Sequence, residues 1–244
     1  MTLHLDYLTL FPEMFGYLHT SILKRAHLSG LITSAVHNMR EHATNKHRTV
    51  DDKPFGGGVG MVLKPDIAHL ALQHLALPTH ARILLMTPQG RTFDQAFAKE
   101  LAKETHLVFL CGHYEGIDER VHQHLVTDEV SIGDYVLTGG ELPALSITDA
   151  VVRLMPGAVG KAASPQEDSF YHGLLDYPHY TRPASYNGWD VPEILMNGNH
   201  AEIEKWRRRE ALKRTFERRP DLLETAELSA SDRKYLAELS AERL

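Results

Sequence analysis

The sequence predicts an α/β protein with a mainly parallel sheet, followed by a smaller helical region. Two observations lead to this prediction. Short apolar runs alternate with helical patterns from the first strand to residue 154, which is the order that builds a parallel sheet with connecting helices. After Pro156 and Gly157 the pattern changes to a polar stretch and then to a long basic helix.

The first elements are a strand, a helix and a strand. Leu3 to Leu10 has leucines on both faces, which predicts a strand that is mostly buried. Pro12 follows it, and proline is tolerated in the first turn of a helix. A helix is predicted from Ser21 to Leu31, and a strand from Ser34 to Met39.

The alternation continues to residue 154. A helix is predicted over Lys64–Leu77 and a short apolar strand over Arg82–Met86. A helix over Asp94–Thr105 leads to the apolar strand Leu107–Leu110, and a helix over Leu142–Leu154 closes the region. The strands are short and continuously apolar, as expected for a sheet that is covered on both faces.

The C-terminal third has a different composition and hydrophobic pattern. Val159 to Ser169 is small, polar and aperiodic, which is typical of a linker that orders when a partner binds. Leu174–Pro183 continues as loop, Asn199 is predicted to cap a helix, and residues 221–244 to form a second helix. Acidic residues alternate with the cations of the first of these helices, so a salt-bridged surface helix without function is an alternative interpretation. The cations of the first helix are Lys205, Arg207, Arg208, Arg209, Lys213, Arg214, Arg218 and Arg219.

Composition bounds the class of protein. A chain of 244 residues with 43% hydrophobic residues suffices for one large domain and a small one. The single cysteine, Cys111, excludes an internal disulfide framework and fits a reducing compartment. No signal peptide is evident, and no apolar run is long enough to span a bilayer. We therefore expect a cytoplasmic protein without membrane contact.

Charge and histidine content set further limits. The formal net charge of −6 argues against nonspecific nucleic-acid binding over the whole surface but allows a local basic patch. Sixteen histidines raise the question of metal, yet no H-E-x-x-H or paired Cys/His signature is present. We expect His37, His42, His47, His122 and His124 to be solvated rather than metal ligands.

Glycine-rich loops follow the apolar strands. One is C-G-H-Y-E-G-I-D-E-R from Cys111, and the next is S-I-G-D-Y-V-L-T-G-G-E-L-P from Ser131. Glycine is used where the backbone turns with positive φ or approaches a ligand closely. Together the loops favour a pocket of backbone amides and carbonyls, and two tight turns without function are the alternative. The tetrapeptide Thr87-Pro88-Gln89-Gly90 ends a third strand at the edge where open α/β sheets bind ligands.

A further loop, H-R-T-V-D-D-K-P-F-G-G-G-V-G-M from His47, contains four glycines. It matches neither a phosphate-binding P-loop nor a dinucleotide fingerprint. A flexible linker is one interpretation, but its charged and aromatic residues make it richer than Gly/Ser filler.

These motifs resemble the TrmD family, the bacterial tRNA (guanine-N1)-methyltransferases of the SPOUT class, over nearly the whole chain. The resemblance implies a SPOUT-type parallel sheet with a C-terminal trefoil knot. Such a knot is an exception to the rule that protein chains do not thread through their own loops. It also implies a methyltransferase domain over residues 1–158, a linker over 159–172 and a helical tRNA-binding domain over 173–244.

The cofactor that the resemblance implies is S-adenosylmethionine, bound in a bent conformation. Glu115 is implied to accept hydrogen bonds from its ribose hydroxyls. The implied cofactor residues are Leu85, Met86, Thr87, Pro88, Gln89, Gly90, Gly112, Tyr114, Glu115, Gly116, Ser131, Ile132, Gly133, Tyr135, Leu137, Gly139, Gly140 and Pro143.

The loop from His47 resembles the family's D-D-R-P-Y-G-G-G-P-G-M loop, which lies beside the substrate guanine. In this chain Lys53 stands for Arg, Phe55 for Tyr and Val59 for Pro. Lysine does not offer a planar two-pronged donor, which weakens the case for a bidentate contact at position 53.

Methylation of guanine N1 needs a general base, because N1 carries a proton, and a group that stabilises charge on O6. The many carboxylates cannot be ranked from the sequence alone. By resemblance, Asp168 in E-D-S-F is the base and Arg153 in D-A-V-V-R braces the guanine. The alternatives are a solvated carboxylate at 168 and a cation that opposes the helix dipole at 153.

The resemblance further implies methylation of guanosine 37 beside the anticodon, binding of the anticodon stem-loop, and a homodimer with shared active sites. It implies Mg²⁺ as well, although no motif indicates where the ion binds. Three alternatives stay open. They are a 2′-O-ribose methyltransferase of the same class, a noncatalytic RNA-binding regulator, and a nucleotide-dependent dehydrogenase, which lacks its fingerprint here.

Overall fold

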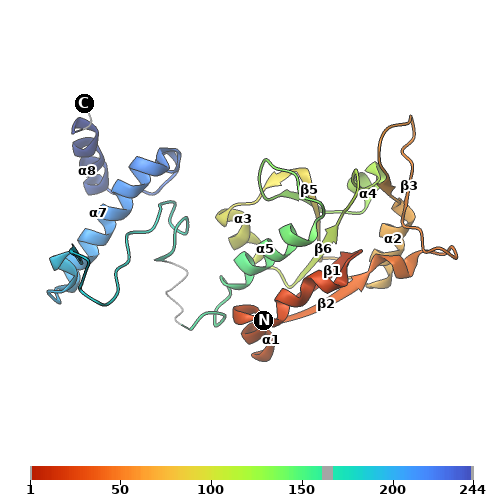
Figure 1. The fold of residues 1–244 in the computed structure, drawn as a ribbon, viewed down its shortest axis with the longest axis horizontal. Coiled ribbons are helices and arrows are strands. Elements are labelled where there is room, and N and C mark those ends of the chain that lie inside the picture. The colour runs from red at the N-terminus through yellow and green to blue at the C-terminus, as the bar shows by residue number, and fades with distance from the viewer. Residues whose placement is uncertain (1, 161–166, 243–244) are drawn as a thin grey trace. The chain divides into compact units, whose positions relative to one another are not determined.

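The computed structural model of the protein describes residues 2–160 and 167–242. The chain forms two compact units, Met1–Ala162 and Ala163–Leu244 (Figure 1). Residues 161–166 of the predicted linker lie outside the described residues. No helix in the described ranges is both long and apolar enough to cross a membrane.

The first unit is built on a parallel sheet of five strands in the order β2-β1-β6-β5-β7. Neighbours are in parallel register; Tyr7 of β1, for example, lies opposite Phe109 of β6. This arrangement confirms the predicted α/β class. The strands are β1 (Leu3–Thr9), β2 (Ile32–Asn38), β5 (Arg82–Thr92), β6 (His106–Cys111) and β7 (Asp128–Ser131).

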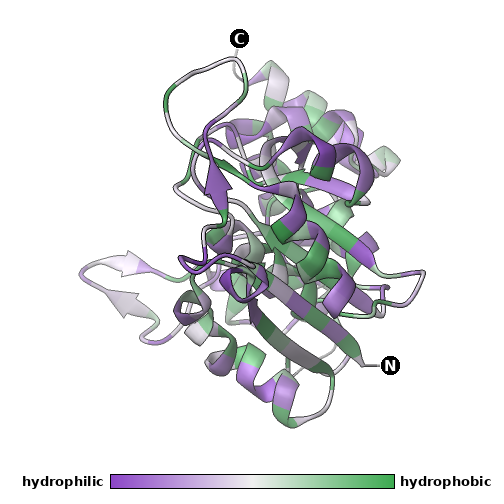
Figure 2. Cartoon of the chain, turned by 90° about the vertical axis from the view of Figure 1, so that its right-hand side faces the viewer, coloured by the Kyte–Doolittle hydropathy of each residue, from purple (hydrophilic) through white to green (hydrophobic). Residues whose placement is uncertain are grey.

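Helices cover both faces of this sheet, because side chains alternate along each strand. In β6, Leu107 and Phe109 belong to one hydrophobic cluster, and Val108 belongs to the other. Figure 2 shows the hydrophobic residues concentrated on the central strands. The first cluster includes residues of α1 (Ser21–Leu28), α3 (Gln95–Leu101), α5 (Glu141–Val152) and the 3-10 helix η1 (Pro12–His19). The second includes α2 (Pro65–His74), α4 (Glu119–His124) and η2 (Met39–His42).

The structure corrects several predicted boundaries in this unit. Strand β5 does not stop at Met86 but continues to Thr92, with a register shift against β7 between Met86 and Arg91. The short strands β3 (Asp51–Asp52) and β4 (Val62–Leu63) pair antiparallel around the glycine-rich loop. Helix α4 and strand β7 were not predicted, because each is short and lacks a clear period.

The second unit is less purely helical than predicted. It contains α7 (His200–Arg218), α8 (Ala230–Ala241), the 3-10 helices η3 (Glu193–Leu195) and η4 (Pro220–Glu224), and a hairpin of β8 (Ser185–Tyr186) and β9 (Trp189–Asp190). The predicted cap is confirmed, since the Asn199 side chain accepts from the Glu202 N–H at 3.3 Å. A single helix over 221–244 is wrong: Ser229 and Asp232 form a capping box that starts α8.

Asp232 links α8 to α7 through Arg208. Its buried carboxylate accepts from Arg208 Nη2 at 2.8 Å and from the Ser229 N–H at 2.9 Å. Burial by itself raises the pKa of Asp232, but the hydrogen bonds from Arg208 and Ser229 outweigh it and lower the pKa to about 2. Because the unfolded value is about 3.9, this stabilisation is complete above about pH 4 and is lost as the pH falls toward 2.

We expect Asp232→Asn to lower the free energy of unfolding of the second unit by about 1–2 kcal/mol at pH 7 and by little at pH 2. Both tryptophans, Trp189 and Trp206, lie in this unit, so their fluorescence during urea denaturation measures the change. The exposed pair Arg219–Asp221 provides the control, because Asp221→Asn removes only a surface interaction. Equal effects of the two substitutions would contradict the assignment of this stabilisation to the buried carboxylate of Asp232.

Candidate active site

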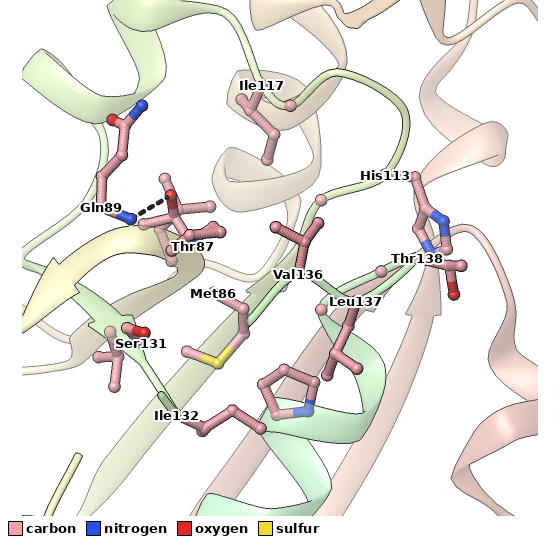
Figure 3. Close-up of a pocket in the computed structure, with 18 of the residues that line it drawn as sticks. Met86, Thr87, Gln89, His113, Ile117, Ser131, Ile132, Val136, Leu137 and Thr138 are labelled. Carbon is pink, nitrogen blue, oxygen red and sulfur yellow. Dashed lines mark hydrogen bonds between the residues drawn. The ribbon is translucent and has the colours of Figure 1, made fainter. Parts of the chain in front are cut away.

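A cavity of about 320 Å³ lies at the carboxyl ends of β6 and β7 and along the middle of β5. Its walls are the β5 segment Leu85–Gln89, the loop after β6, the loop after β7 and the start of α5. Figure 3 shows Met86, Ser131 and Leu137 converging on this space. The cavity is where parallel α/β sheets bind ligands, and its volume lies within the usual range of about 300–1,000 Å³ for small-molecule sites.

The structure brings the implied cofactor residues together at this cavity, with the exception of Gly90. A Cβ at Gly90 would lie 2.3 Å from the backbone of Glu129, so this glycine permits the close approach of β5 to β7. The implied residues that line the cavity are Leu85, Met86, Thr87, Pro88, Gln89, Gly112, Tyr114, Glu115, Gly116, Ser131, Ile132, Gly133, Tyr135, Leu137, Gly139, Gly140 and Pro143.

The loop after β6 and the loop after β7 are joined through their backbones. The Gly140 N–H donates to the Gly112 carbonyl at 3.0 Å. A Cβ at Gly140 would lie 2.8 Å from Cys111 Cα and 2.9 Å from Met86 Cβ, so no larger residue fits without displacement. The apolar Leu85, Met86, Ile132, Leu137 and Pro143 line the cavity together with a few polar groups, which is the composition expected for a small-molecule site.

A buried carboxylate lies at the start of α5, next to the cavity. Glu141 is 1% exposed; its Oε1 accepts from Thr9 Oγ1 at 2.6 Å, and His113 Nε2 lies 2.8 Å from its Oε2. His113 itself lines the cavity. Burial raises the pKa of the Cys111 thiol well above its usual range, and the charge on Glu141 adds to this effect.

The glycine-rich loop between β3 and β4 adjoins the same site. The Glu115 N–H donates to the Met61 carbonyl at 3.0 Å, and the Leu63 N–H donates to the Gly116 carbonyl at 2.9 Å. A Cβ at Gly60 would lie 2.4 Å from the Glu115 side chain. Phe55 at the tip of this loop is 99% exposed, so its aromatic ring is available to a partner.

Several cavity residues were missed. The expectation that His122 and His37 are solvated is wrong: His122 Nδ1 lies 3.1 Å from a Glu129 carboxylate oxygen, and His37 Nε2 lies 2.6 Å from one of Asp6. His113 stands inside the G-H-Y-E-G motif, which was the one signal that could have found it. The lining residues outside the predicted cofactor segments are Ile117, Glu119, His122 and Val130, whereas His113, Val136 and Thr138 lie within those segments but were not singled out.

The two proposed catalytic residues do not line this cavity. Arg153 caps the far end of α5, whose first residues border the cavity. Arg153 lies twelve positions after Glu141, which is about 18 Å along the helix axis. Asp168 belongs to the second unit, where its carbonyl accepts from the Tyr171 N–H at 3.3 Å.

Within residues 2–160 and 167–242, no group of three or more His, Cys, Asp or Glu side chains could hold a metal ion. A Mg²⁺ ion that is bound mainly through water and substrate does not need such a cluster.

Comparison with known proteins gives the family. The model of the family described as tRNA (Guanine-1)-methyltransferase TrmD matches residues 3–225. The tRNA (guanine-N(1)-)-methyltransferase of Bacillus subtilis is 57% identical over 241 residues, covering 98% of this chain and 99% of that protein. That of Exiguobacterium sibiricum is 58% identical over 238 residues, with 98% of each chain covered. That of Staphylococcus epidermidis is 57% identical over 233 residues, with 95% of each chain covered. This chain belongs to the tRNA (guanine-1)-methyltransferase TrmD family.

Proposed function

We propose that this protein transfers a methyl group from S-adenosylmethionine to N1 of the guanosine at position 37 of tRNA, beside the anticodon. The observation that carries the proposal is the cavity at the strand ends, built from the two long motifs shared with the family. Position 37 and the anticodon stem-loop come from the family resemblance. The buried, single Cys111 is compatible with the cytoplasm as the place of action.

The residues of the cavity fit the proposed cofactor. When bound, S-adenosylmethionine supplies an electrophilic methyl group. The backbone of Leu85–Gly90, Gly112–Gly116 and Ile132–Gly140 would hold the adenosine and methionine parts, and Glu115 would accept from ribose hydroxyls. The trefoil knot remains part of this proposal. Displacement at a methyl carbon is in line, so the chain contributes mainly by positioning the two reactants.

Guanine N1 becomes nucleophilic when its proton leaves, and Asp168 would accept that proton. Arg153 would stabilise the negative charge that develops on O6. We further propose that the protein is a homodimer whose active sites are shared. The separation of about 18 Å between Glu141 and Arg153 along α5 supports this, because Arg153 lies at the end of the helix opposite to the one that borders the cavity of its own chain. A twofold dimer would repeat any contribution of one chain to the other.

The second unit would bind tRNA through α7. Lys205, Arg209 and Lys213 recur every four residues, so they form one exposed stripe. Arg207 and Arg208 are less exposed than these three cations, and Arg208 pairs with the buried Asp232. A cavity of about 440 Å³ between α7 and α8 borders this stripe.

We expect the double substitution Arg209→Gln with Lys213→Gln to weaken binding of all tRNAs alike. The log–log salt dependence should flatten by about 0.7–0.9 for each phosphate that the variant no longer binds, measured by filter binding at several salt concentrations. Arg218→Gln is the matched control, because it removes one exposed cation from another side of α7. An unchanged slope in the double variant would favour the surface-helix alternative.

Mass analysis of tRNA after incubation with labelled cofactor tests the proposed function. We expect one methyl group at N1 of guanosine 37. Methylation of a ribose 2′-oxygen would establish the alternative enzyme, and tRNA binding without transfer would indicate a regulator. The same assay with EDTA in place of Mg²⁺ tests the proposed ion requirement, and unchanged transfer with EDTA would refute it.

A further inference from the structure

The buried trio Thr9, Glu141 and His113 joins three separate segments. Thr9 ends β1, His113 follows β6, and Glu141 begins α5. The Thr9 hydroxyl also accepts from the Phe11 N–H at 2.9 Å, and the Phe11 ring lies 4.7 Å from the His113 ring. A carboxylate that is 1% exposed is costly to bury unless its oxygens are hydrogen-bonded, and both oxygens of Glu141 have partners.

The trio determines which nitrogen of His113 carries a hydrogen. While the Glu141 carboxylate is ionised it only accepts hydrogen bonds, and Nε2 of His113 is then the donor to Glu141 Oε2. In the neutral ring Nδ1 then carries a lone pair. Nδ1 has no hydrogen-bond partner among residues 2–160 and 167–242, and His113 lines the cavity beside Thr138 (Figure 3).

The ring has little freedom to move. His113 and Gly139 are bridged through their backbones, and a Cβ at Gly139 would lie 2.3 Å from His113 Nε2 and 2.5 Å from Glu141 Oε2. The absence of a side chain at 139 therefore lets the imidazole and the carboxylate meet. The pair also joins the 112–116 loop to the start of α5, and both form walls of the cavity.

We propose that Glu141 is a positioning residue for the cofactor site and acts through His113. Its carboxylate holds the imidazole in the Nε2–H tautomer, so that Nδ1 accepts a hydrogen bond from a hydroxyl or amino group of the bound nucleoside. The inference rests on the proposed function, since it takes S-adenosylmethionine as the occupant of the cavity.

Glu141→Gln is the main test, because it preserves size but cannot accept from both Thr9 and His113. Its single amide oxygen would take one hydrogen bond, and its NH₂ group would turn His113 Nε2 into an acceptor. We expect the dissociation constant for S-adenosylhomocysteine, measured by titration calorimetry, to rise about ten- to a hundredfold. Melting of the unliganded protein is recorded in parallel.

Thr148→Val is the matched control on the same helix. It breaks the buried hydrogen bond of 2.8 Å between Tyr7 and Thr148 without touching His113. It should lower the melting temperature and leave the dissociation constant unchanged. Equal losses of affinity in both variants would reduce Glu141 to a general stabilising role and overturn the proposal.

The double variant His113→Phe with Glu141→Gln tests whether Glu141 acts through His113. It buries no charge at this place, so it keeps the test open if Glu141→Gln alone fails to fold. We expect it to bind S-adenosylhomocysteine no more weakly than His113→Phe alone. Fully additive losses, or wild-type affinity in the double variant, would contradict the proposal. If the wild-type protein does not bind the ligand at all, the proposed function fails rather than this inference.

Discussion

Asp168→Asn should lower turnover on tRNA by about 10² or more while leaving cofactor affinity nearly unchanged. The asparagine keeps the size and polarity of the side chain but cannot accept the N1 proton, and general-base catalysis contributes roughly 10²–10⁴. Single-turnover methylation with saturating tRNA measures the chemical step. Calorimetric titration with S-adenosylhomocysteine measures the affinity.

The neighbouring carboxylate provides the control. Glu167 lies 3.4 Å from the Tyr177 hydroxyl, so Glu167→Gln changes one adjacent acid without removing the proposed base. It should turn over at close to the wild-type rate. If Asp168→Asn retained that rate as well, Asp168 would not be the base, and the carboxylate of Asp176 would be tested next.

Mixing two inactive variants should restore activity, if the active sites are shared between chains. Thr87→Trp fills the cavity, because Thr87 lies at its lining (Figure 3), and it leaves Asp168 intact. Asp168→Ala keeps the cavity and removes the base. Each homodimer should be inactive, whereas a mixed dimer combines one open cavity with one intact Asp168 from the other chain. Gly140 is less suitable for this purpose, since any side chain there would press on Cys111.

The co-refolded mixture should recover roughly one site for each mixed dimer. Native mass spectrometry of differently tagged chains confirms that mixed dimers form, and methylation of tRNA gives the activity. In this mixture no single chain has both an open cavity and Asp168, so activity requires a site that is shared between two chains. Mixed dimers without activity would therefore contradict the shared-site proposal. Melting of Thr87→Trp by itself shows whether its first unit remains folded.

Much of the fold could be predicted because it depends on local pattern. The continuous apolar residues around Leu107–Leu110 indicate a strand buried on both faces, and Asn199 marks a helix start through its own side chain. The elements that were missed, such as β7 with its polar Asp128 and Glu129, owe their conformation to pairing with β5. A strand of this kind has no hydrophobic periodicity from which it could be predicted.

The sequence by itself determined the class of the sheet, the two glycine-rich cofactor motifs and, through them, the resemblance to the family. Only the tertiary structure decided that Glu141 is buried against Thr9 and His113, residues 132 and 28 positions away. It also decided that Arg153 lies a helix length from the cavity of its own chain. The physical reason is that local conformation follows from neighbouring residues, whereas the partner of a buried charge is set by the packing of distant segments.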